Sequence, residues 1–150
     1  MATWGMNHAP TISNSRSWRS SMGTNYYAVD NRCHCCGRYD RTHHIGKSSW
    51  GWAFSFRGYR EERLVSWQAW KQFLADREIR DEYGDAVSWE DFVRMIETVK
   101  APGHVREDGH RNLQHNAEGQ KPNERGYTWF NPEYDWDDDE GYAFSSREFW

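Results

Sequence analysis

Two cysteines three positions apart form the clearest chemical motif in the chain. Cys33 and Cys36 are followed at once by Gly37. This spacing lets both thiolates reach one tetrahedral zinc ion, while the glycine permits a tight turn. The motif therefore predicts a zinc knuckle, which is half of a structural zinc site. A redox pair needs a helix directly after the second cysteine, and residues 39–42 are a poor helix start. Inert cysteines, which neither bind a metal nor form a redox pair, are a further alternative.

The other zinc ligands must be imidazoles or the third cysteine, because two thiolates fill only half of the coordination sphere. His44 is the expected third ligand, since it follows Cys36 by eight residues, which is enough for the chain to return to the turn. The candidates for the fourth ligand are, in order of preference, His104, then His110, then His43 or Cys35. Because zinc binding is part of the folding free energy of such domains, loss of Cys33 or Cys36 is expected to release zinc and unfold the protein.

A possible anion site follows the histidines in the sequence. The residues that can contact an anion are Gly46, Lys47, Ser48, Ser49 and Arg57. The segment is similar to the end of a phosphate-binding P-loop, but that motif needs a glycine at the position of Arg41 and a helix afterwards. We expect either a structural turn or a small anion site beside the zinc.

Two further motifs fail a check of their spacing. Residues 135–141 have the acidic composition of a calcium loop, but its sixth position is Glu140 instead of Gly and its twelfth is Ser146 instead of Glu. Residues 108–116 contain the residue types of a ββα-metal nuclease. Such a site needs a metal ligand on a following helix, and no amphipathic pattern follows His115. Calcium binding and nuclease activity are therefore disfavoured.

Two strands are expected to support these groups. Residues 26–29 suit a short strand that ends in turn chemistry at Asp30. Residues 50–57 alternate strictly between large aromatic and small residues. Alternation of this kind predicts a strand with one buried face, which consists here of Trp50, Trp52, Phe54 and Phe56.

Two amphipathic helices are expected to cover the sheet. Ser66 and Ser88 are N-cap signals, and each precedes apolar residues that recur every three or four positions. Residues 83–85 make the turn between the helices, and residues 127–130 and 142–145 are further expected strands. The resulting fold class is α+β: a small mixed domain in which the two helices pack on an antiparallel sheet of aromatic-rich strands.

The composition is that of one small domain. The chain has 150 residues, and its ten Trp within a 17% aromatic share predict a core built from rings. We expect a flexible leader over residues 1–22 and a single zinc-binding domain over residues 23–150. No apolar run has the length of a membrane span or of a secretory signal. The expected location is therefore the cytoplasm, without a membrane partner.

Charge is unevenly distributed along the chain. Residues 16–63 carry nine Lys and Arg against four Asp and Glu, whereas residues 131–150 carry one against seven. The basic segment suits an anion, but the net charge of −4 is far from the basic balance of duplex-binding domains. Duplex nucleic acid is disfavoured as a partner, and a host protein or an anionic small molecule stays open.

The order of these motifs resembles a family of small uncharacterised bacteriophage proteins. The resemblance is carried by Gly23-Thr24-Asn25-Tyr26-Tyr27, by Cys33-x-x-Cys36-Gly37-Arg38, and by His44-Ile45-Gly46-Lys47-Ser48-Ser49 with Gly51-Trp52 and Phe54. It extends to residues 81–84, 141–144 and 148–149, and so it covers the chain from Met22 onward. The resemblance implies a phage origin, supports the zinc site and makes Met22 an alternative start. It implies no activity.

The chain lacks a recognisable catalytic set. The expected function is that of a non-enzymatic phage accessory protein in the host cytoplasm. It would carry a structural zinc, and it would bind a host or phage macromolecule or sequester a small anionic, nucleotide-like ligand. A metal-dependent nuclease or nucleotide-processing enzyme is the first alternative, and a minor virion component is the second.

Overall fold

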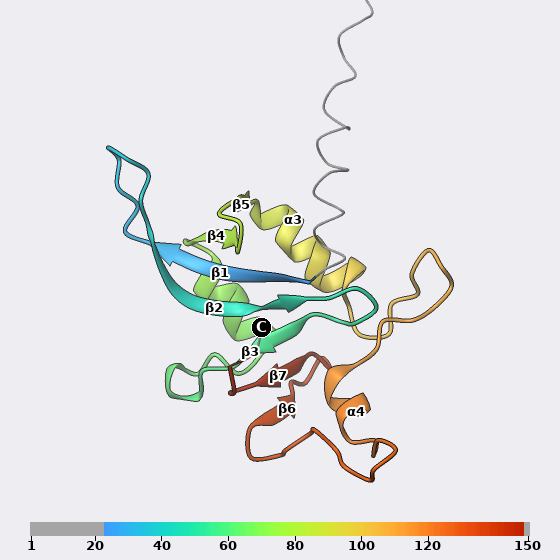
Figure 1. Ribbon diagram of the computed structural model, residues 1–150. Coiled ribbons are helices and arrows are strands. Elements are labelled where there is room, and N and C mark those ends of the chain that lie inside the picture. Colours follow the sequence, from blue (N-terminus) through green and yellow to red (C-terminus); the bar gives the residue numbers. More distant parts are fainter. Residues whose placement is uncertain (1–22, 149–150) are drawn as a thin grey trace, which may run out of the picture.

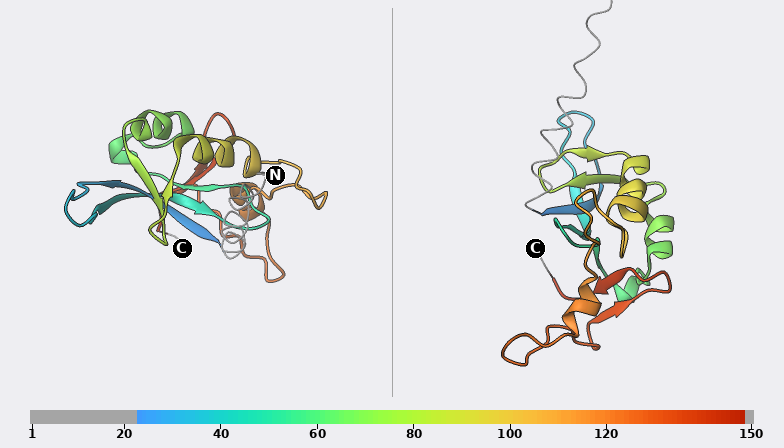
Figure 2. Two further views of the ribbon diagram at one scale, coloured as in Figure 1. Left: turned by 90° about the horizontal axis from the view of Figure 1, so that it is seen from above. Right: turned by 90° about the vertical axis from the view of Figure 1, so that its right-hand side faces the viewer.

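The computed structural model describes residues 23–148, which form a seven-stranded sheet with two helices against one face (Figures 1 and 2). The strand order across the sheet is β5-β4-β1-β2-β3-β7-β6. Neighbouring strands are antiparallel except β3 and β7, which run parallel. The predicted leader, residues 1–22, lies outside the described residues. The bounds are β1 Thr24–Asp30, β2 Asp40–Ser48, β3 Ser55–Arg57, β4 Glu78–Asp81, β5 Ala86–Val87, β6 Asp135–Asp137 and β7 Ala143–Ser145.

Both predicted helices are present and begin at the predicted caps. The hydroxyls of Ser66 and Ser88 each accept the backbone N–H three residues further on, at 3.1 Å. This satisfies one of the free N–H groups of each first turn. No helix among the described residues is both long and apolar enough to cross a membrane. The helical segments are η1 Arg60–Glu62, α2 Trp67–Leu74, α3 Trp89–Arg94, its π-helical continuation η2 Met95–Val99, and α4 His115–Gly119.

The core between the sheet and the helices is built from rings, as the composition predicted. The ring centroids of Phe54 and Phe56 lie 4.7 Å apart, and Phe144 of β7 stacks on Phe56 at 4.8 Å. Trp67 and Trp70 of α2 are fully buried against them. Each such side chain contributes about 1.5–3 kcal/mol by leaving water. The predicted α+β class is confirmed in this coarse form, and the zinc knuckle stays a prediction.

The predicted strand over residues 50–57 is wrong in its first half. Gly51 has a φ of +87°, and the amide of Trp52 donates to the Ser49 carbonyl in a turn. Regular pairing therefore begins only at β3. Phe54 is fully buried as predicted, but Trp50 is 62% exposed. Alternation in the sequence could not show that this turn directs Trp50 to the surface.

Four other strands were missed and one was wrongly predicted. β2 is the longest strand and includes the segment that was expected to be a turn. β4 and β5 flank the predicted turn at residues 83–85, and β6 lies inside the acidic segment. Residues 127–130 are not a strand. The predicted strands at residues 26–29 and 142–145 correspond to β1 and β7.

Candidate functional site

The cysteine turn, residues 31–39, is the tip of the β1–β2 hairpin and projects away from the rest of the domain (Figure 1). The Cys33 amide donates to the Arg38 carbonyl at 2.6 Å, and the Gly37 amide donates to the Cys33 carbonyl at 2.8 Å. Gly37 has a φ of +76°, so the tight turn that the sequence predicted after the cysteines is present. Hydrogen bonds from the backbone of Cys36, and then of Cys35, lower the pKa of the Cys33 thiol.

The structure does not bring His44 to this turn. His44 pairs with Tyr27 in the β1–β2 ladder, four residues along β2 from Asp40, which is about 13 Å at the usual rise of a strand. Its Nε2 lies 2.9 Å from the Asn25 side-chain oxygen, and its ring packs on that of Tyr27. Burial, and then the positive charge of Arg57, lowers the pKa of His44 to about 4. His44 is therefore a neutral, packed histidine of the sheet.

The other proposed ligands also lie away from the cysteines. His104 is in the loop after η2, where its carbonyl accepts the Asn112 amide at 2.9 Å. This loop is at the opposite end of the sheet from the cysteine turn (Figure 1). His43 faces α2, with its ring 4.7 Å from that of Phe73 and its Nε2 2.9 Å from Glu62. Within residues 23–148, no three His, Cys, Asp or Glu side chains are grouped so that they could hold a metal ion.

The expected anion residues divide between the sheet interior and its surface. Lys47 pairs with Ser55, so Lys47 and Arg57 lie on the same face of the sheet. Ser48 is buried, and the carbonyl of Ser49 accepts Lys100 Nζ at 2.9 Å. A side chain at Gly46 would collide with the Ser55 carbonyl and the Phe54 ring, and so this glycine is needed for packing. Only the two cations and the Ser49 hydroxyl remain for an anion.

A groove that the sequence did not predict lies beside these residues, and we call it the Trp50 groove. It is an open hollow of about 670 Å³. None of the described residues that line it is acidic. The lining consists of Trp50, Gly51, Trp52, Arg106, Gly109, His110, Arg111 and Leu113.

Arg106 is the most constrained cation of the groove. Its Nε and Nη2 donate to the two carboxylate oxygens of Asp108 at 3.2 and 3.3 Å. Its guanidinium carbon lies 4.9 Å from the ring centre of Trp50. The remaining nitrogen, Nη1, is buried beside Gly51 and has no hydrogen-bond partner among the described residues. A buried donor without a partner is costly and rare, so a shift of the Arg106 side chain that brings Nη1 to a ligand oxygen in the groove would be favourable.

The walls of the groove are joined by backbone hydrogen bonds between distant segments. The Leu113 amide donates to the Gly51 carbonyl at 2.9 Å, and the Ala53 amide donates to the Leu113 carbonyl at 2.8 Å. The side-chain amide nitrogen of Asn112 donates to the backbone carbonyls of Val99 and Ala101. These contacts fix the indole of Trp50 opposite the arginine loop.

The residues of the nuclease-like segment pack around the groove. A short helix, α4, does begin at His115, but the His115 ring stacks on Trp52 with centroids 4.5 Å apart. Burial lowers the pKa of His115 to about 4. His115 and Asn112 therefore support the groove wall, while His110 and Arg111 face the groove itself.

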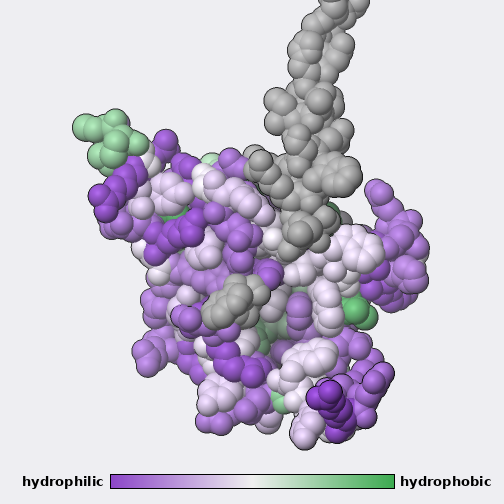
Figure 3. Space-filling view, viewed as in Figure 1, coloured by the Kyte–Doolittle hydropathy of each residue, from purple (hydrophilic) through white to green (hydrophobic). Residues whose placement is uncertain are grey.

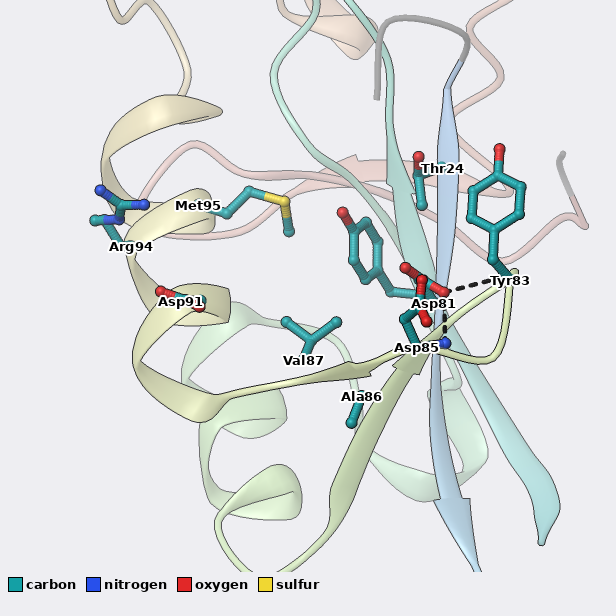
Figure 4. Close-up of a pocket in the computed structure, with 10 residues that line it drawn as sticks. Thr24, Asp81, Tyr83, Asp85, Ala86, Val87, Asp91, Arg94 and Met95 are labelled. Carbon is teal, nitrogen blue, oxygen red and sulfur yellow. Dashed lines mark hydrogen bonds between the residues drawn. The ribbon is translucent and has the colours of Figure 1, made fainter. Parts of the chain in front are cut away.

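A second hollow lies between β1, the β4–β5 turn and α3 (Figure 4). Its volume is about 230 Å³, and its lining includes three carboxylates and one guanidinium, that of Arg94. Asp81 uses one carboxylate oxygen to accept the amides of Tyr83 and Asp85 at 2.9 and 3.0 Å. An excess of carboxylates repels an anion. The Trp50 groove is thus the better site for an anionic ligand.

Comparison with family models, curated proteins and solved structures gives a clear result. None of them matches this chain. The function must therefore be argued from the two sites that the structure presents, the cysteine turn and the Trp50 groove.

Sequence reasoning missed the groove because its residues come from two distant segments. Each segment alone is an ordinary loop. The available signal was Ser48-Ser49-Trp50-Gly51, in which two serines and a glycine surround a tryptophan and favour a turn over a strand. A second signal was the placement of Arg106, His110 and Arg111 around Gly109, since a glycine among polar residues is typical of a tight hairpin loop.

Proposed function

We propose that this protein is a non-enzymatic binding protein that holds a nucleotide-like anion in the Trp50 groove. The observation that carries the proposal is the pairing of an exposed indole with the orphan N–H of Arg106 at one wall. A planar base can stack on the indole, and a phosphate can accept hydrogen bonds from the guanidinium. The ligand class thus agrees with the small anion that the sequence analysis expected.

The geometry supports stacking on one side of the Trp50 ring. Arg106 covers one face of the indole, and the side chain is nevertheless 62% exposed. The other face is therefore available to a base. Base stacking on an aromatic side chain contributes about 1–3 kcal/mol. This is enough to give nucleotides a clearly higher affinity than inorganic phosphate.

The charge of the groove supports an anion over a neutral ligand. Asp108 offsets the charge of Arg106, but Arg111 faces the groove without an acidic residue in the described lining. Arg111 donates one N–H to the Gly103 carbonyl at 2.9 Å and keeps further donors for a ligand. Attraction of this kind is screened by salt, so affinity should fall as ionic strength rises.

The test is a titration of the full chain with nucleoside triphosphates, cyclic nucleotides and a short single-stranded oligonucleotide, followed by tryptophan fluorescence and calorimetry. Inorganic phosphate and an uncharged nucleoside are the two chemical parts of the ligand. Each alone should bind at least about tenfold more weakly than the whole nucleotide. Comparison of the mononucleotides with the oligonucleotide distinguishes a free nucleotide from a single strand as the source of the anion.

Trp50→Ala and Arg111→Gln should each weaken binding about tenfold, because they remove the stacking surface and one phosphate donor. Tyr127→Ala is the matched control, since Tyr127 is 70% exposed and lies outside the groove. Unchanged affinity in Trp50→Ala would contradict the proposed site. Consumption of the nucleotide during the titration would instead make the protein an enzyme, and binding only to assembled phage particles would favour a virion component.

The phage origin is implied by the family resemblance, and the cytoplasmic location is an expectation from the sequence; both stay predictions. They agree with a protein that sequesters a nucleotide-like signal in a host cell. A zinc ion at the cysteine turn is a separate proposal, because the turn and the groove share no described residue.

A further inference from the structure

The cysteine turn places Cys33 and Cys36 in one tight backbone turn. The Cys33 amide donates to the Arg38 carbonyl, and the Gly37 amide donates to the Cys33 carbonyl. Gly37 provides the left-handed residue that closes the turn. This arrangement of two cysteines around a tight turn is one half of a tetrahedral zinc site.

The described part of the chain provides no second half for this site. His44 is held in the sheet by Asn25 and Tyr27, and His104 lies at the other end of the domain. No third metal-binding side chain in residues 23–148 joins the cysteine pair. Two thiolates leave two positions of a structural zinc ion to be filled from elsewhere.

The position of the turn allows a second molecule to fill them. The tip of the hairpin projects beyond the sheet and the helices (Figure 1). In the space-filling view it is an isolated apolar spot next to strongly polar residues (Figure 3), and Cys35 and Cys36 are exposed there. The tip is therefore accessible to a second copy of the chain.

A zinc ion bound by four thiolates carries a net charge of −2. Arg32 and Arg38 lie within the turn, while Asp30 and Asp40 flank it and accept hydrogen bonds from Asn31. Arg32 is mostly exposed and lies 3.9 Å from Glu78. The two arginines and the two flanking aspartates balance, so the cysteine pair and the position of the turn carry the inference.

We propose that one zinc ion joins two copies of this chain, with Cys33 and Cys36 of each copy as its four ligands. The contact is isologous, because the same pair of residues is used on both sides of a two-fold axis. Each copy releases the protons of two thiols on binding, and no electrons are transferred. The zinc then acts as a link between molecules, and the hydrophobic core of each domain forms without it.

The test measures the mass and the metal content of the full chain, kept reduced throughout so that no disulfide can form. With zinc, light scattering after gel filtration should give twice the monomer mass, and elemental analysis should give one zinc per two chains. A chelator should return the monomer. Cobalt in place of zinc should give the absorption bands of a tetrahedral site with four thiolates.

Cys36→Ser should abolish both the zinc and the dimer. Cys35→Ser is the matched control, since it removes a neighbouring exposed thiol that is outside the three-residue spacing, and it should keep both. One zinc per chain in a monomer would overturn the proposal, because the missing ligands would then lie in the same chain. Loss of zinc from a His8→Ala variant of that monomer would overturn it in the same way and would identify His8 as one of those ligands. A protein that takes up no zinc, or a dimer that persists in chelator, would overturn it as well.

Discussion

The β1–β2 hairpin ends in the cysteine turn on one side and leads into the Trp50 groove on the other, and the two ends are built differently. The turn consists of consecutive residues and few contacts tie it to the rest of the domain. The groove joins residues 50–52 to residues 106–113 through the hydrogen bonds of Leu113 with Gly51 and Ala53. A local site keeps its chemistry when the fold changes, whereas an assembled site depends on the whole domain.

The largest effect is expected for the core residue beneath the groove. Phe54→Ala should lower the free energy of unfolding by about 3–5 kcal/mol, because it leaves a cavity among buried rings. The backbone amide of residue 54, which donates to the Lys100 carbonyl at 2.9 Å, is retained in this variant, so the loss reports on the side chain alone. Urea unfolding measures the change. The control is Trp50→Ala at the surface, which should stay within about 0.5 kcal/mol. A loss below about 1 kcal/mol for Phe54→Ala would show that the groove is independent of the core.

We expect a fall in pH to lower the free energy of unfolding through the buried histidine beside the Trp50 groove, before it affects the cysteine turn. The pKa of His115 is about 4 in the folded protein and about 6.5 when unfolded. Below pH 6.5 the unfolded chain therefore binds more protons. The stabilisation is complete above pH 6.5 and is lost as the pH falls towards 4. Each pKa unit is worth about 1.4 kcal/mol, so about 2–3 kcal/mol should be lost by pH 4.5.

Urea unfolding at pH 7.5 and 4.5 measures this loss. His115→Gln should reduce the difference between the two pH values, although His44, whose pKa is also lowered to about 4, keeps part of it. Tyr127→Ala at the exposed surface is the control and should leave the difference as it is. An equal difference in His115→Gln and in the unchanged protein would be evidence against a buried neutral imidazole at the groove.

A glycine at each end of the hairpin offers a direct comparison. Gly46→Ala should cost about 1–3 kcal/mol, because the new methyl group meets the Ser55 carbonyl and the Phe54 ring. Gly37→Ala has no neighbour within 4 Å and should cost only about 1 kcal/mol, the strain of its positive φ. Thermal and urea unfolding of the two variants should rank them in this order. The reverse order would place the greater packing constraint in the turn.

The smallest effect is expected for the cysteines in the absence of metal. The sequence led us to expect that loss of Cys33 or Cys36 unfolds the domain, but the structure places both outside the core. In chelator, Cys36→Ser should therefore unfold within about 0.5 kcal/mol of the unchanged protein, with Cys35→Ser as its control. Unfolding of Cys36→Ser at room temperature would restore the view of zinc as a structural requirement of each domain.

Local signals in the sequence were sufficient for the elements that depend on local chemistry. The serine caps located α2 and α3, and the tight turn after Cys36 was expected from Gly37. The aromatic share predicted the ring core. β2 was missed because it carries Arg41, His43, His44 and Lys47, which are poor strand signals, and its burial comes from pairing with β1 on one side and β3 on the other.

The candidate site was predictable only in part. The cysteine pair could be recognised because its three-residue spacing is by itself enough to let both thiolates bind one metal ion. His44 could not be assigned correctly, since its distance from the cysteines depends on a strand register that no local pattern specifies. Trp50 was placed in the core by its alternation with Trp52 and Phe54, whereas the positive φ of Gly51 turns it outward.

The parallel pairing of β3 with β7 has a consequence for how the chain folds. β7 adds Phe144 to the stack begun by Phe56, although the two strands lie far apart in sequence. Contacts of such long range slow folding. During translation β3 has a free edge until residues 143–145 have left the ribosome, and an uncovered edge invites pairing with other chains. We therefore expect the nascent protein to need protection from aggregation until its last strand is made.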